Sequence, residues 1–146
     1  MSATPVTDFL DLAKKALQDA RNNKQQLTLV IGKDNPDLDS IASAVILGYF
    51  RTAFPPKDPW SSWYIPIVNE SREVLETYPM LSRALKHASI DLHHLTTLED
   101  LVVEGRSSGL HEDVTRFFFV DHNVSVKAIC AQRHHAESST DYPWKK

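Results

Sequence analysis

Two short, mostly apolar runs constrain the fold of this chain more than any other feature. The first is Leu27–Ile31, closed by Gly32, and the second is Thr115–Val120. Apolar runs of this length, rich in β-branched and aromatic residues, predict strands that are buried on both faces, as in parallel sheets. Each run leads into a polar loop, Lys33–Ser40 after the first and Asp121–Asn123 after the second. Because ligands of parallel sheets bind outside the carboxyl ends of the strands, these two loops form the candidate site.

The rest of the chain alternates between helical and strand-like segments. Between Thr7 and Ala20, apolar residues recur at helical spacing on one face, whereas Ile41–Phe50 is apolar on nearly every side, which is typical of a buried helix. The remaining expected elements are a strand at Trp63–Val68, a helix at Glu70–His87, a brief strand at Asp91–His94 and a helix at Leu98–Val103. Pro66 indicates an edge position or an irregularity in the strand that contains it. This order predicts an α/β fold with a mainly parallel sheet and helices on both faces.

The length of 146 residues predicts one main domain. We expect an N-terminal amphipathic helix and linker at residues 1–26, an α/β domain at residues 27–131 and a polar, disordered tail at residues 132–146. The net charge of −3 shows no basic excess, so we expect neither nucleic acid nor a membrane surface as a partner. The single cysteine, Cys130, excludes an intramolecular disulfide and indicates a reducing compartment, the cytoplasm.

Carboxylates gather in both loops, which favours a divalent cation. Asp37 and Asp39 lie two residues apart, and Asp121 is followed by His122 and Asn123. Carboxylates held close together repel one another unless a cation lies between them. Oxygen ligands with an imidazole favour Mg²⁺ or Mn²⁺, with Co²⁺ or Zn²⁺ as further options. The alternatives are structural: Asp39 or Ser40 caps the helix that begins near Ile41, and the second loop is a turn.

The same residues carry a resemblance to a known family. The run Leu29–Ala44 (LVIGKDNPDLDSIASA) resembles motif I of the DHH phosphoesterase superfamily, and Phe118–Asn123 (FFVDHN) resembles its motif II. The first run is most similar to fungal cytosolic exopolyphosphatases and the related prune proteins, and Asn35–Asp37 also resembles the manganese-dependent pyrophosphatases. The resemblance covers residues 27–123.

This resemblance implies a two-metal site with Mn²⁺ or Mg²⁺, and Co²⁺ is a further option. Asp37 and Asp39 would each bind one metal and Asp121 would bridge both, with His122 and Asn123 as catalytic residues beside them. The implied reaction is hydrolysis of the terminal phosphoanhydride of inorganic polyphosphate by a metal-bound hydroxide, and pyrophosphate is the alternative substrate.

Two basic residues are candidates for substrate binding. Lys33 stands where the family has Asn or His after the glycine, and it either contacts a phosphate or points to solvent. Arg72 suits phosphate geometry, and the alternative is an exposed residue in the first turn of a helix. The oligomeric state is not predicted.

The two adjacent histidine pairs of the chain, His93–His94 and His134–His135, are not assigned to the metal site. The Asp-His-His motif that names the superfamily is replaced by Arg133, His134 and His135, and no family C-terminal domain follows. The chain is therefore expected to be a truncated domain, and a catalytically inactive binding module is the alternative function. The other pair, His93 and His94, is interpreted as strand neighbours that point to opposite faces and therefore share no metal.

Overall fold

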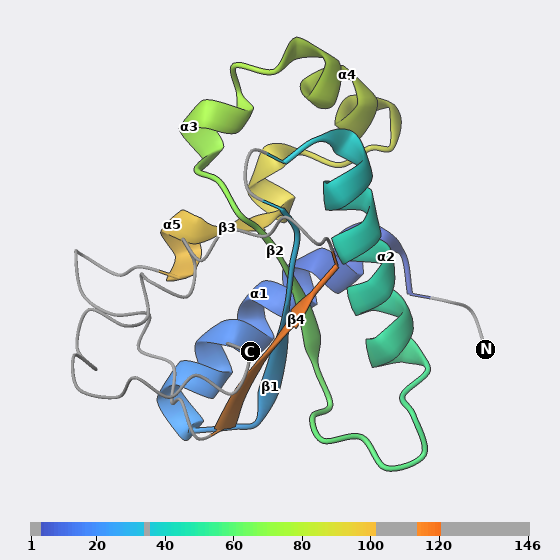
Figure 1. Cartoon of the computed structure of the whole chain (residues 1–146), viewed down its shortest axis with the longest axis vertical. Helices are drawn as coiled ribbons and strands as arrows, with labels where there is room; N and C mark the ends of the chain where they lie inside the picture. Colours follow the sequence, from blue (N-terminus) through green and yellow to red (C-terminus); the bar gives the residue numbers. More distant parts are fainter. Residues whose placement is uncertain (1–3, 34–35, 102–113, 121–146) are drawn as a thin grey trace.

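The computed structural model describes residues 4–33, 36–101 and 114–120. Four strands form an all-parallel sheet in the order β3-β2-β1-β4, and helices flank it (Figure 1). The strands are β1 (Leu27–Ile31), β2 (Tyr64–Val68), β3 (Thr96–Thr97) and β4 (Thr115–Phe119). The helices are α1 (Val6–Asn23), α2 (Leu38–Ala53), α3 (Arg72–Leu75), α4 (Pro79–His87), the 3₁₀ helix η1 (Leu92–His94) and α5 (Leu98–Leu101). The α/β fold expected from the sequence is confirmed.

Strand β1 lies between two neighbours and is buried at every position. Leu29 pairs with Ile65 of β2 on one side and with Phe117 of β4 on the other. Helix α2 covers one face of the sheet, and α1 crosses the opposite side (Figure 1). The contact of α2 depends on Gly48, because a Cβ atom there would lie 2.8 Å from the carbonyl oxygen of Tyr64. The mostly apolar pattern of β1 fits a strand buried on both faces, and its one polar side chain, Thr28, is hydrogen-bonded to the Ser61 hydroxyl at 2.7 Å.

Two strands differ from their expected positions. Strand β2 lies inside the sheet and not at its edge, although it contains Pro66. Proline is tolerated there because β3 begins to pair only at Ile67, so Pro66 lies beyond the end of that ladder. Strand β4 is not fully buried, because among the described strands it is an edge of the sheet, and 43% of Phe118 is exposed.

Helix α2 is also less buried than its composition indicates. Its inner face is buried at Ile41 and Val45, whereas Ile46 and Phe50 are 57% and 56% exposed. The expectation of a helix that is buried all round was therefore wrong. The Phe50 ring contacts that of Phe54 but remains largely exposed, and hydropathy alone does not show which face of α2 meets the sheet. No helix in the described part of the chain combines the length and apolar character needed to span a membrane.

The segment Glu70–His87 is two short helices and not one. Helix α3 ends at Leu75, and α4 begins with Pro79 at its first position. Tyr78, the residue before the proline, is extended with φ −101° and ψ 93°, as the proline ring requires of the residue that precedes it. The expected strand at Asp91–His94 was also wrong: this segment is a turn followed by η1, and the strand begins at Thr96.

Candidate metal and phosphate site

The structure brings the ends of β1 and β4 together. These strands are parallel neighbours, and the Val120 backbone N–H donates to the carbonyl oxygen of Ile31 at 3.1 Å. The loop after β1 therefore begins beside Val120, the residue that follows β4. Asp121, His122 and Asn123 lie outside the described residues.

Asp37 is the N-cap of α2. Its Oδ1 accepts from the Ser40 backbone N–H at 2.9 Å, and the Ser40 hydroxyl accepts from the Asp37 N–H at 3.1 Å, so the two residues form a capping box. The structure confirms that the Asp-x-Asp-Ser run caps the helix. The capping residue is Asp37, however, and not Asp39 or Ser40, because helix α2 begins at Leu38, three residues earlier than expected.

Asp37 also contacts Lys33, the basic candidate residue of this loop. Its Oδ2 lies 2.7 Å from the Lys33 Nζ atom, which donates a hydrogen bond to it. The pKa of the Asp37 carboxyl is below its ordinary value, mainly because Lys33 donates to it and then because the Ser40 N–H does. A lowered folded-state pKa contributes stability above the ordinary pKa of an aspartate, and that contribution is lost as the pH falls through the acid range.

The donors of this loop fit a hard divalent cation. Asp37 directs one oxygen to the helix cap and the other to a cation, and Lys33 supplies that cation in this structure. Asp39 follows in the first turn of α2 and is exposed. Two exposed carboxylates on one turn are the oxygen ligands that Mg²⁺ and Mn²⁺ prefer. A metal at Oδ2 of Asp37 would take the place of the Lys33 ammonium.

Arg72, the other candidate for substrate binding, is engaged within the protein. Its Nη2 atom donates to the Asp100 carboxylate and to the Leu95 carbonyl oxygen, both at 2.6 Å. Its Nε atom donates to the Leu92 carbonyl oxygen at 3.4 Å, and Nη1 lies 3.5 Å from a Glu99 oxygen. Arg72 thus joins the start of α3 to the segments on either side of β3, and the guanidinium is not presented to a ligand.

We therefore expect Arg72→Ala to destabilise the fold by about 2–3 kcal/mol, because it removes the cationic partner of a partly buried carboxylate and the donor to two carbonyl groups. Arg72→Lys is expected to recover less than half of this loss, since an ammonium cannot reproduce the planar fork. Urea unfolding of the three proteins measures both effects. Equal stability of all three would show that the contacts of Arg72 do not support the fold.

Asn69 was missed in the sequence, and the pair His93 and His94 was misinterpreted. Asn69 follows the last residue of β2 and is fully buried, so a polar side chain lies at the carboxyl end of a third strand. The signal was an Asn directly after an apolar run. Among the described residues, the one group of three His, Cys, Asp or Glu side chains whose ligand atoms approach one another is Asp91, His93 and His94, and it excludes Asp37 and Asp39.

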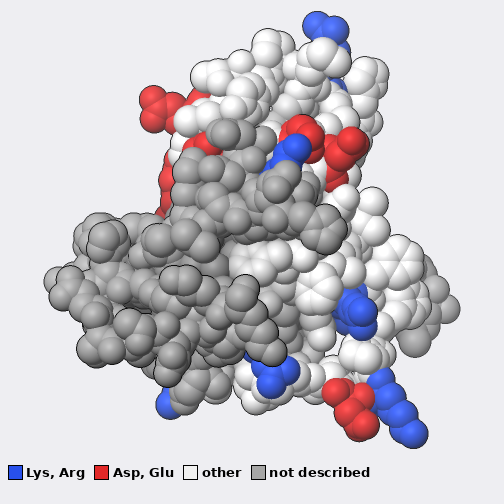
Figure 2. All heavy atoms as spheres, viewed as in Figure 1, with Lys and Arg blue, Asp and Glu red and all other residues white. Residues whose placement is uncertain are grey.

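In the view of Figure 2, acidic and basic side chains are interspersed, and the described residues form no continuous basic area.

Comparisons of the chain with protein-family models, with curated proteins and with solved structures gave no match.

Proposed function

We propose that this chain is the N-terminal part of a metal-dependent phosphohydrolase that releases terminal phosphate from inorganic polyphosphate. The observation that supports it best is the parallel pairing of β1 with β4, since the hydrogen bond from the Val120 backbone N–H to the Ile31 carbonyl oxygen brings the carboxyl ends of these two strands side by side. Ligands of parallel sheets bind outside the carboxyl ends of the strands, and in the sequence these two strands lead into the loops that hold Asp37, Asp39 and Asp121. The resemblance of both loops to the DHH motifs supports the same reaction class.

The roles of the residues follow from their chemistry. Asp37, Asp39 and Asp121 would hold two Mn²⁺ or Mg²⁺ ions, with Co²⁺ as an alternative. The bound metals would polarise a phosphoryl oxygen and lower the pKa of a water molecule. Lys33, released from Asp37, would place a positive charge beside the transferred phosphate. His122 and Asn123 would orient the substrate from the second loop.

The test is phosphate release from long-chain polyphosphate and from pyrophosphate, with Mn²⁺ and then with Mg²⁺. We expect turnover of polyphosphate, and we expect Asp121→Asn to abolish it. Asp58→Asn, which changes an exposed aspartate in the loop before β2, is the matched control and is expected to retain full activity. Release from pyrophosphate alone would indicate the pyrophosphatase alternative. A folded chain without turnover on either substrate would contradict the proposed activity.

One observation favours the second candidate, a catalytically inactive module that binds phosphorylated ligands. The Lys33 ammonium lies 2.7 Å from the Asp37 carboxylate and pairs with it where the hydrolase would hold a metal. In that case Lys33→Asn would increase metal affinity without producing turnover, whereas in the hydrolase the same change would lower the affinity for polyphosphate. As part of the proposal we place the hydrolase in the cytoplasm, because Cys130 is the one cysteine of the chain.

A further inference from the structure

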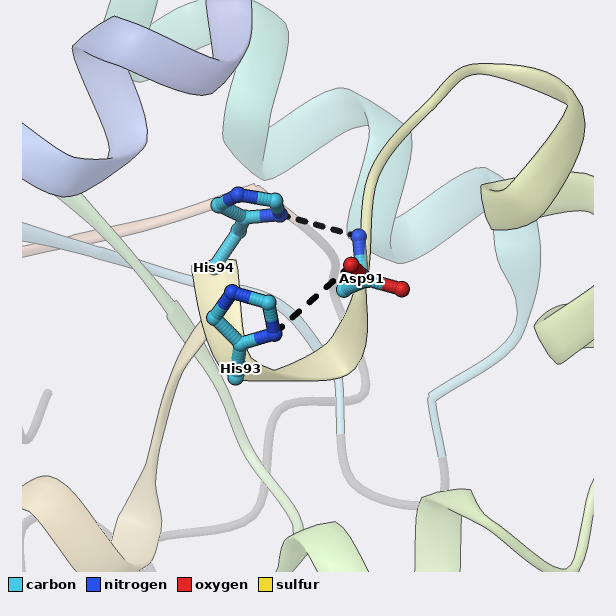
Figure 3. Close-up of side chains that lie close together, drawn as sticks. All are labelled: Asp91, His93 and His94. Atoms are coloured by element: carbon cyan, nitrogen blue, oxygen red, sulfur yellow. Dashed lines mark hydrogen bonds and ion pairs between the residues drawn. The ribbon is translucent and has the colours of Figure 1, made fainter.

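The turn before β3 brings together three side chains that can bind a metal. A carboxylate oxygen of Asp91 and one nitrogen each of His93 and His94 lie within 4.8 Å of one another. Figure 3 shows both imidazole rings beside Asp91, and the ring centroids are 4.2 Å apart. The expectation that these histidines point to opposite faces was therefore wrong, because it assumed a strand. In the 3₁₀ helix η1, adjacent side chains can project toward the same neighbour.

We propose that Asp91, His93 and His94 form a second metal site, specific for Zn²⁺ or a similar transition metal. Two imidazoles and one carboxylate are a ligand set that zinc, nickel and copper favour over magnesium or calcium. A tetrahedral zinc holds its ligand atoms roughly 3.3 Å apart, so the three atoms would have to close by up to about 1.5 Å from their 4.8 Å limit. This site is separate from the acidic loop after β1, and it does not depend on the proposed hydrolysis.

The local contacts allow this closure. His93 Nδ1 lies 3.8 Å from the Asp91 Oδ2 atom, which is too long for a hydrogen bond. The side chains of both residues are more than 70% exposed, so small rotations meet little steric resistance. The main chain is held more firmly, since the Lys14 ammonium donates to the His93 carbonyl oxygen from α1. A metal would therefore find a fixed backbone with movable ligands.

His94 limits the affinity. Its Nδ1 atom accepts from the Asp91 backbone N–H at 2.9 Å, as part of a capping box that starts η1. To bind a metal, the ring must either give up this hydrogen bond or turn to present Nε2. The remaining coordination positions would be taken by water. We therefore expect binding in the micromolar range, weaker than a buried four-ligand zinc site.

The experiment is a calorimetric titration of the whole chain with Zn²⁺ in excess Mg²⁺, which occupies sites made of oxygen ligands. We expect one Zn²⁺ to bind, and we expect His93→Ala to lower its affinity at least about tenfold, as loss of a ligand predicts. This single variant keeps the hydrogen bond between His94 and Asp91, so the turn remains folded. The double variant His93→Ala/His94→Ala is expected to abolish binding.

The chain offers a matched control in its other adjacent pair, His134 and His135. Changing both to alanine is expected to leave the zinc affinity within about twofold of the original chain, as is His87→Ala. Asp121→Asn is also expected to have no effect, which separates this site from the proposed active site. With Co²⁺ as the probe, visible absorption of the bound ion should disappear with His93→Ala. Unchanged zinc affinity in His93→Ala, or an equal loss in the His134/His135 control, would overturn the proposal.

Discussion

Asp37→Asn is expected to reduce phosphate release at least about 100-fold while leaving the helix cap in place. Loss of a residue that only supports a metal ligand already lowers metal affinity or activity by about 10- to 100-fold, and Asp37 is a proposed direct ligand. Asparagine caps helices as well as aspartate does, because its side-chain oxygen can also accept from the Ser40 N–H. The substitution therefore removes the charge and keeps the local fold.

Asp37→Ala is the companion variant, because it removes the cap as well as the charge. We expect it to lower the free energy of unfolding by about 1 kcal/mol relative to Asp37→Asn, which is the usual contribution of an N-cap. The ion pair with Lys33 adds little to either loss, since its carboxylate is 54% exposed. Urea unfolding without metal measures this difference.

The same pair of variants separates metal binding from folding. Mn²⁺ is expected to raise the melting temperature of the original chain, because a ligand that binds only the folded state stabilises it. Both Asp37 variants should lose this increase equally, although their stabilities without metal differ. A full Mn²⁺-induced increase in Asp37→Asn would show that Asp37 is not a ligand, and the assignment of the first loop would be wrong.

Ile41→Ala is expected to destabilise the protein by about 2–5 kcal/mol. Ile41 is 3% exposed on the inner face of α2, and truncation there leaves a cavity in the main core. Ile46 lies on the same helix and is 57% exposed, so Ile46→Ala is expected to change stability by less than about 0.5 kcal/mol.

Chemical unfolding, followed by the fluorescence of the tryptophans, measures this contrast between the two isoleucines. The pair is matched in residue type, helix and substitution, and therefore isolates the contribution of burial. If Ile46→Ala were as destabilising as Ile41→Ala, the outer face of α2 would be covered in solution, in contrast to the structure of the isolated chain.

Local sequence patterns were sufficient for much of the fold. The run Leu27–Ile31 predicted β1 with its bounds, because a run of five mostly apolar, partly β-branched residues closed by a glycine is typical of a buried strand. Helical spacing predicted α1, and the alternation of elements predicted a parallel sheet. The pairing of β1 with β4 follows from no local pattern, because it depends on which strands are neighbours in three dimensions.

Some errors arose from neighbours that are distant in the sequence, and others from local contacts that the apolar pattern does not reveal. Pro66 indicated an edge position or an irregularity because a proline lacks a hydrogen-bond donor, and the short β3 leaves that position of an inner strand unpaired on one side. Asp37, and not Asp39, became the helix cap because α2 begins earlier than its apolar residues indicate. Hydropathy also could not show which face of α2 would remain exposed.

The two proposed sites differ in how much of each could be predicted from the sequence. The sequence by itself identified the loop after β1 as a candidate site, because Lys33, Asp37 and Asp39 lie within seven residues of one another. Only the tertiary structure showed that Arg72 is engaged by Asp100 and that His93 and His94 lie beside Asp91. The physical reason is that a residue type sets what a side chain can bind, whereas the backbone conformation and the packed neighbours decide which partners lie within its reach.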